Sequence, residues 1–86
     1  MGLEQNKSPE ISKHAIKYLK SLDKKQRERL LLAISKIPFG NIKPLLGTSS
    51  FRLRVGDLRI IYEWLNEEQI IISYIGSRGD VYKKGF

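Results

Sequence analysis

The chain has 86 residues, of which 41% are hydrophobic and 29% are charged, so we expect one domain of modest stability. It contains no cysteine, which excludes a disulfide framework, a thiolate zinc site and a cysteine nucleophile. Sixteen lysines and arginines against nine aspartates and glutamates give a net charge of +7, which favours a polyanion or an acidic protein as the partner.

No targeting signal is expected at the start of the chain. Residues 1–7 lack the apolar run of a signal peptide, and no apolar run elsewhere approaches the roughly 18 residues of a membrane span. The sequence therefore predicts a single cytoplasmic domain over residues 1–86 that does not engage a membrane.

A first amphipathic helix is predicted to begin near residue 9. Ser8, Pro9 and Glu10 have the form of an N-cap, a proline at the first helical position and an acid in the first turn. The apolar stripe of this helix consists of Ile11, Ala15, Ile16, Leu19 and Leu22, and Lys13, Lys17 and Lys20 lie on the other face. The stripe predicts core packing, and the lysine face is expected to be solvated.

A second helix is predicted to begin at Asp23, which together with Gln26 has the form of a capping box. Its apolar stripe consists of Leu30, Leu31, Ile34 and Ile37. Pro38 disfavours the helical conformation of the residue before it, and with Gly40 it ends the pattern. Residues 9–37 are therefore predicted to form a helical hairpin.

After the breaker-rich segment 38–50 the apolar period changes to two, which predicts strands. The first strand begins at Phe51. Residues 58–65 and 69–75 are rich in Ile, Tyr and Trp and flank a polar Asn-Glu-Glu turn, so they are predicted to be two interior strands of a hairpin. The order of elements predicts an α+β fold, with the helical hairpin packed on one face of a small antiparallel sheet of three to four strands.

A tight turn fixes the register of the first two strands. Residues 55–58 have the form of a two-residue hairpin loop, with glycine at the first central position as a type II′ turn requires. In this register Arg54 lies directly opposite Arg59. Arg52 then lies opposite Ile61, and all four side chains share one face of the sheet. Three arginines therefore converge.

The arginine cluster predicts an anion site. Like charges directly opposite one another destabilise a sheet, and a bound anion relieves that destabilisation. Phosphate is the natural candidate because the planar guanidinium matches its geometry bidentately. Arg78, in a predicted loop over residues 76–80, is placed to swing over this face. The alternative that the pattern leaves open is a solvated basic face that only aids solubility.

Other residue patterns predict neither a metal site nor a cofactor site. His14 is the only histidine and is expected on the surface of the first helix. Asp57, Glu63 and Asp80 are scattered along the chain rather than set at ligand spacing. The sequence contains no GxSxG, P-loop or dinucleotide fingerprint.

The run FRLRVGDLRIIYE and the later IGSRGDVY resemble segments of the RelE/ParE toxins of bacterial and archaeal toxin–antitoxin pairs. Those segments carry an aromatic residue, basic residues at alternate positions, Gly-Asp and an arginine, and later a glycine, an arginine and a tyrosine. The resemblance extends over about residues 9–82 and includes the helical hairpin and the KPLLGTSS segment.

The resemblance implies a RelE-like fold and a ribosome-dependent, metal-independent endoribonuclease that cuts messenger RNA in the A site, inhibits translation and is neutralised by a cognate antitoxin. In the family chemistry the 2′-hydroxyl attacks the adjacent phosphate, and basic side chains stabilise the transition state. By matching position, the implied catalytic residues are Arg54, Arg59, Arg78 and Tyr82, and Arg52, Lys83 and Lys84 are expected to bind RNA. Tyr82 is expected to stack on a base or to assist proton transfer.

The chain departs from the family pattern in three respects. The best-studied nucleases of the family carry lysine or another titratable group on this strand, whereas Arg52 and Arg54 do not deprotonate in proteins, which leaves the general base unassigned. Residues 1–7 make a poor strand where the family usually has one, so we expect them to be poorly structured or to form a short edge strand. The family's C-terminal extension is expected to be nearly absent.

Two alternative functions stay open, because fold similarity does not settle function. One is a ParE-like toxin that inhibits DNA gyrase without cleaving RNA, and the other is an inactive RNA-binding relative. In either case we expect the antitoxin to place an acidic or amphipathic segment on the basic, partly apolar surface.

Overall fold

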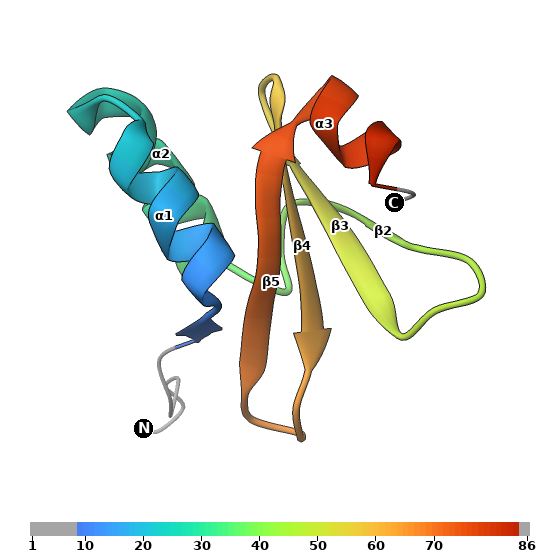
Figure 1. Cartoon of the computed structure of the whole chain (residues 1–86). Helices are drawn as coiled ribbons and strands as arrows, with labels where there is room; N and C mark the ends of the chain where they lie inside the picture. The colour runs from blue at the N-terminus through green and yellow to red at the C-terminus, as the bar shows by residue number, and fades with distance from the viewer. Residues whose placement is uncertain (1–8, 85–86) are drawn as a thin grey trace.

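The computed structural model describes residues 9–84, in which two N-terminal helices lie beside a five-stranded sheet of order β1-β5-β4-β3-β2 (Figure 1). The strands are β1 (Glu10–Ile11), β2 (Asn41–Pro44), β3 (Ser50–Val55), β4 (Leu58–Trp64) and β5 (Ile70–Ser77), and the helices are α1 (Lys13–Ser21), α2 (Lys24–Ser35) and α3 (Arg78–Lys83). Neighbouring strands are antiparallel except β1 and β5, which are parallel. The predicted α+β fold is confirmed, with a sheet of five strands rather than three to four.

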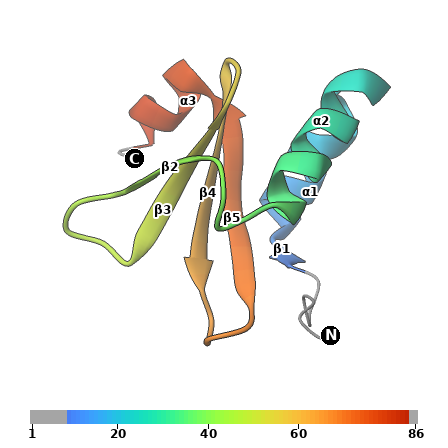
Figure 2. The same ribbon diagram turned by 180° about the vertical axis from the view of Figure 1, so that it is seen from behind.

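Opposite edges of the sheet carry different elements. Figures 1 and 2 place α1 and α2 on the β5 side of the sheet and β2 at the far edge. The third helix, α3, packs on β5 and β4. No helix within residues 9–84 is long and apolar enough to cross a membrane.

The first helix begins at Lys13, later than predicted. Its N-cap is Ser12, whose Oγ accepts a hydrogen bond from the Ala15 N–H (3.2 Å), so the predicted start at Pro9 is wrong. Residues 10–11 pair with β5 instead, because strand pairing satisfies their backbone groups while Ser12 caps the helix behind them. The predicted cap, Ser8, and the segment 1–7 lie outside the described residues.

The second helix begins as predicted. Asp23 is its N-cap, and Oδ1 accepts a hydrogen bond from the Gln26 N–H (2.8 Å). Arg27 donates from its guanidinium to two carbonyls at the end of α1, which ties the two helices together. The helix ends at Ser35, two residues before Ile37, because the chain turns ahead of the proline.

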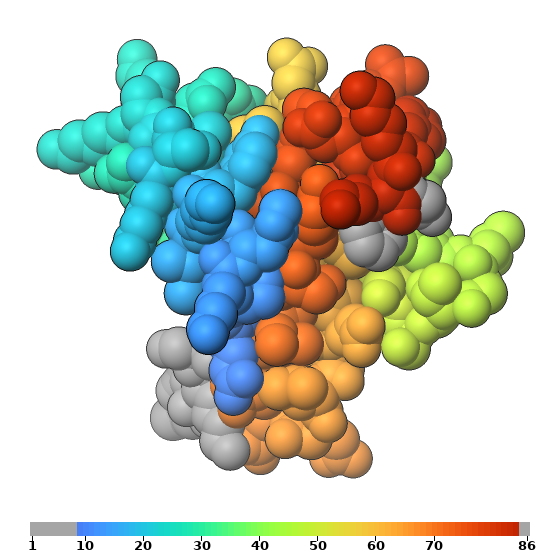
Figure 3. Space-filling model, viewed as in Figure 1, coloured from blue at the N-terminus to red at the C-terminus, as the bar shows by residue number. Residues whose placement is uncertain are grey.

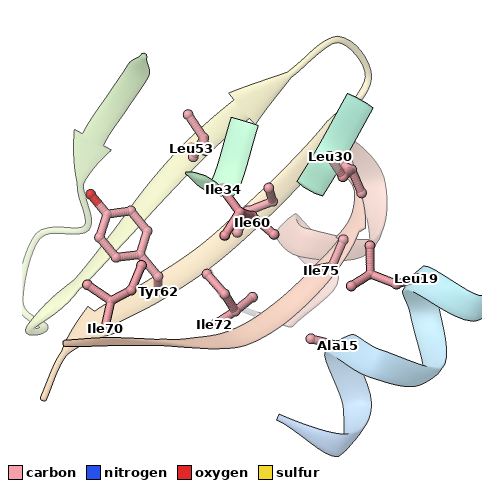
Figure 4. Close-up of a cluster of buried hydrophobic side chains, with 10 residues drawn as sticks. All are labelled: Ala15, Leu19, Leu30, Ile34, Leu53, Ile60, Tyr62, Ile70, Ile72 and Ile75. Atoms are coloured by element: carbon pink, nitrogen blue, oxygen red, sulfur yellow. The ribbon is translucent and has the colours of Figure 1, made fainter. Parts of the chain in front are cut away.

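The hydrophobic core lies between the helical hairpin and one face of the sheet, where side chains of both layers point toward one another (Figure 4). It contains Ala15, Leu19, Leu30 and Ile34 from the helices and Leu53, Ile60, Tyr62, Ile70, Ile72 and Ile75 from the strands. The predicted core residues Ile16 and Leu31 are instead 40% and 43% exposed. Each follows a fully buried residue, and neighbouring side chains on a helix point about 100° apart, so both cannot face the sheet.

The breaker-rich segment contains a strand that the sequence pattern did not predict. In β2, Asn41 lies opposite Arg54 and Lys43 lies opposite Arg52. This strand is short and ends in Pro44, a residue that sheets tolerate at an edge because the missing N–H then faces away from the ladder.

The predicted register of the β3–β4 hairpin is confirmed: Arg54 pairs with Arg59, and Arg52 pairs with Ile61. Gly56 has a φ of +60°, and no other type of residue within 9–84 has a positive φ. Only the first central position of the turn therefore needs the left-handed region, as in type II′.

The chain after β5 forms helix α3, so the predicted loop over residues 76–80 is wrong. Gly79 disfavours a helix, which is why the sequence indicated a loop. Two features outweigh it: Ser77 Oγ caps the helix by accepting from the Asp80 N–H (3.2 Å), and Val81 is buried, with only 1% exposure.

Candidate active site

A pocket of about 300 Å³ lies on the sheet face opposite the hydrophobic core, and we call it the cationic pocket. It is lined by Asn41, Lys43, Arg52, Arg54, Arg59, Arg78 and Tyr82. Five of these side chains are cationic, and none of the lining residues within the described part of the chain is a carboxylate. Such a lining can bind an anion and repels cations.

Two rows across the sheet position most of the lining. Asn41, Arg54 and Arg59 lie side by side on β2, β3 and β4, and Lys43 lies beside Arg52 one row further along. The register of the β3–β4 turn places Arg54 beside Arg59, since a slip of one residue would move the side chains of one strand to the other face. The pairing of β2 with β3 then adds Asn41 and Lys43 to the two rows.

Helix α3 adds the remaining two side chains. The Arg78 N–H donates to the Asp57 carbonyl (3.1 Å), which ties the start of α3 to the β3–β4 turn. The Arg78 guanidinium lies 5.9 Å from the centroid of the Tyr82 ring, a cation–π distance. Tyr82 is 59% exposed, so its ring is open to a ligand.

Arg59 lies among three other arginines, Arg52, Arg54 and Arg78. Burial lowers the pKa of its guanidinium, and the neighbouring charges of Arg54, Arg52 and Arg78 lower it further. Arg59 Nη1 donates to two backbone carbonyls at the β3–β4 turn, each at 2.9 Å, which fixes its position without neutralising its charge. A bound anion therefore relieves the repulsion between arginine side chains that the strand register places next to one another.

Asn41 holds Arg54 with a neutral group. In the amide orientation that gives both groups partners, the Asn41 side-chain oxygen accepts from Arg54 Nη2 (2.6 Å) and Nε (3.2 Å). Because an amide carries no net charge, Arg54 is oriented while it keeps its full positive charge for a ligand.

The structure brings together five of the predicted site residues: Arg52, Arg54, Arg59, Arg78 and Tyr82. Lys83 and Lys84 are exposed at the end of α3 and do not line the pocket. His14 is exposed on α1 and also lies outside the lining. Within residues 9–84, no three His, Cys, Asp or Glu side chains gather as metal ligands would.

Asn41 and Lys43 were missed by the sequence analysis. The available signal was weak: they flank one apolar residue at a spacing of two, inside a segment rich in Pro and Gly. Their membership in the site depends on pairing with β3, which a local pattern does not reveal.

Comparison with known proteins places this geometry in a family. A family model described as the ParE toxin of the type II toxin–antitoxin system, parDE, matches residues 10–82. No curated protein matches the sequence.

Several solved structures share the fold. The chain is similar to the RelB–RelE antitoxin–toxin complex from Methanococcus jannaschii, with 26% identity and a TM-score of 0.71 over 87% of this chain and 96% of that one. It is also similar to the archaeal RelE–RelB complex from Pyrococcus horikoshii OT3, with 29% identity and a TM-score of 0.68 over 83% of this chain and 93% of that one. YafQ from E. coli strain BL21(DE3), at 17% identity and a TM-score of 0.60 over 90% and 99%, shows the fold alone.

Proposed function

Since the chain belongs to the ParE toxin family of type II toxin–antitoxin systems, within the RelE/ParE superfamily, we propose that it is a ribosome-dependent, metal-independent endoribonuclease that cuts messenger RNA and inhibits translation. The observation that carries the proposal is the cationic pocket, in which five cations and an exposed tyrosine surround a space of about 300 Å³. A phosphate of the RNA backbone is the ligand that this lining fits best.

In the proposed reaction the ribose 2′-oxygen forms a bond to the adjacent phosphorus, and the bond from phosphorus to the 5′-oxygen breaks. The products are a 2′,3′-cyclic phosphate and a 5′-hydroxyl, so one proton leaves the 2′-oxygen and one reaches the 5′-oxygen. Negative charge accumulates on the phosphorane, where Arg54, Arg59 and Arg78 stabilise it.

Proton transfer requires a group other than the arginines, whose guanidinium groups do not deprotonate in proteins. Apart from the arginines, the lining offers the ammonium group of Lys43 and the phenol of Tyr82 as groups that can exchange a proton. Tyr82, with its exposed ring, also serves to stack on a base next to the scissile phosphate. These two residues are therefore the candidates for the acid and the base.

The proposed partners follow from the same surface. A phosphate of ribosome-bound messenger RNA occupies the cationic pocket during catalysis, and a cognate antitoxin neutralises the toxin in the cytoplasm. The related archaeal structures are complexes with RelB antitoxins, which supports an antitoxin here. We expect its acidic or amphipathic segment to cover basic, partly apolar surface.

Induction of the chain in a bacterial cell, followed by mapping of 5′ ends on translated messenger RNA, tests the proposal. The wild type should produce codon-phased cuts, and Arg78→Ala should abolish them. Lys20→Ala, which removes an exposed lysine of α1 outside the pocket, is the matched control and should cut normally. Growth arrest without cuts would refute the nuclease assignment.

The matching family model favours a second candidate, a ParE-like toxin that inhibits DNA gyrase. Gyrase inhibition accumulates cleaved DNA complexes while messenger RNA stays intact, so the same induced cells distinguish the two toxins. Salt-dependent RNA binding without growth arrest or cleavage would instead identify an inactive RNA-binding relative.

A further inference from the structure

A β-bulge in β5 turns one aromatic side chain onto the face of the cationic pocket. Ile61 pairs with Tyr74, whereas the next residue of β4, Tyr62, pairs with Ile72, so Ser73 is an extra residue without an opposite partner. Residues two apart on a regular strand share a face. Here the bulge separates them: Ile72 enters the core, and Tyr74 faces the side of the arginines. Bulges are frequent next to active sites, where they redirect a side chain.

The start of α1 is hydrogen-bonded to this bulge. The Ser12 N–H donates to the Ile72 carbonyl (2.9 Å), and Ser12 Oγ donates to the Ser73 carbonyl (3.0 Å). Ser73 Oγ donates in turn to the Ile61 carbonyl (3.2 Å). These bonds hold α1, and with it His14, at a fixed position relative to β5.

The result is a two-ring stack at the surface. The His14 ring lies parallel to the Tyr74 ring, with 4.3 Å between centroids and 9° between planes. Tyr74 also lies against the backbone of Gly76, where an added Cβ would sit 3.0 Å from Tyr74 Cε2. Tyr74 is therefore confined, whereas His14 is exposed. We call this pair the His14–Tyr74 stack.

The stack lies close to the cationic pocket. Tyr74, Ile61 and Arg52 form one row across β5, β4 and β3. Two strand spacings separate the backbones of Tyr74 and Arg52, a distance of roughly 10 Å. In Figure 3, side chains of β5 (orange) reach the surface between α1 (blue) and α3 (red). An RNA strand bound in the pocket is thus within a few nucleotides of the stack.

Lysines flank His14 on α1, and one carboxylate, that of Asp80 in α3, lies beside Tyr74 across Gly76. Lys13 precedes His14, and Lys17 lies one helical turn from Lys13 on the exposed side of α1. The hydrogen bonds of Ser12 already fasten α1 to the sheet, so an exposed flat ring is not needed for that purpose. Flat aromatic faces flanked by lysines are the usual means of holding single-stranded nucleic acid without sequence preference.

We propose that the His14–Tyr74 stack is a nucleobase-stacking subsite for single-stranded RNA, which holds a base of the strand whose phosphate occupies the cationic pocket. This inference rests on the proposed RNA substrate. It assigns to His14 a contact with substrate outside the catalytic lining, and it gives the β5 bulge a function.

Two oligoribonucleotides test the subsite, one with all its bases and one of the same length with abasic interior positions. Removal of one stacking ring typically weakens single-strand binding roughly tenfold. His14→Ala should therefore bind the base-containing strand roughly tenfold more weakly than the wild type and the abasic strand equally well. His14→Phe, which keeps a flat ring, should restore binding, and Lys20→Ala should bind as the wild type does.

Equal affinity of His14→Ala and the wild type for the base-containing strand would overturn the inference, and so would an equal loss on both strands or no binding by the wild type. If His14→Ala loses its circular dichroism signal, His14→Leu replaces it, since leucine keeps an apolar contact without a flat face. The binding assay does not require cleavage, so the two proposals can fail separately. Absence of codon-phased cuts in the induced cells would reject the proposed nuclease activity and leave the subsite standing. Equal binding of the base-containing and abasic strands would reject the subsite and leave the nuclease activity standing.

Discussion

The five cations of the pocket predict how RNA binding responds to salt. Each cation that neutralises a phosphate of a single strand contributes a slope of about −0.7 to a plot of log affinity against log salt. If all five in the lining engage RNA, the slope is about −3.5, and a rise from about 50 to about 200 mM salt weakens binding roughly 100-fold. Replacing Arg54, which the neutral Asn41 orients, with alanine should bring the slope to about −2.8.

Fluorescence anisotropy of a labelled single-stranded oligoribonucleotide, titrated at several salt concentrations, measures these slopes. Arg54→Ala should bind more weakly than the wild type and lose roughly 50-fold over the same salt range. Lys20→Ala, outside the pocket, should keep the wild-type slope. An unchanged slope in Arg54→Ala would refute the reasoning, because it would show that RNA phosphates do not engage the pocket.

Two further predictions concern stability. Val81→Ala, on the buried side of α3, should lower the free energy of unfolding by roughly 1.5 to 3 kcal/mol in urea titrations. Leu46→Ala, at a 95% exposed side chain, should change the free energy of unfolding by less than about 0.5 kcal/mol. Equal effects of the two substitutions would show that α3 does not pack on the sheet. Burial raises the pKa of Tyr62 above its ordinary 10.0, so the stabilisation by its neutral form is complete below pH 10 and is lost as the pH rises through the raised folded-state pKa. Unfolding midpoints should therefore fall more steeply above pH 10 in the wild type than in Tyr62→Phe, and parallel curves would contradict this.

Local chemistry explains which parts of the fold the sequence predicted. The β3–β4 register follows from one glycine at a turn position, so the pairing of Arg54 with Arg59 was predictable from four consecutive residues. The cap at Asp23 is equally local. Most of the candidate site was therefore accessible from the sequence.

Contacts between distant residues explain the errors. Ser8 and Ser12 both precede helix-like sequence, and pairing of residues 10–11 with β5 selects the later cap. Similarly, the edge strand β2 pairs with β3, a contact between segments that a local sequence pattern does not reveal, so Asn41 and Lys43 were not predicted as site residues. Tertiary pairing decided between local alternatives that the sequence left nearly equal.

The chemical identity of the ends of cleaved messenger RNA tests the central claim most directly. Purified wild-type protein added to translating ribosomes should release fragments with a 5′-hydroxyl and a 2′,3′-cyclic phosphate, because in the proposed reaction the 2′-oxygen attacks and the pocket arginines stabilise the developing charge. Arg59→Gln, in the centre of the pocket, should release few or none. Fragments with a 5′-phosphate, or equal cleavage by Arg59→Gln, would contradict the account.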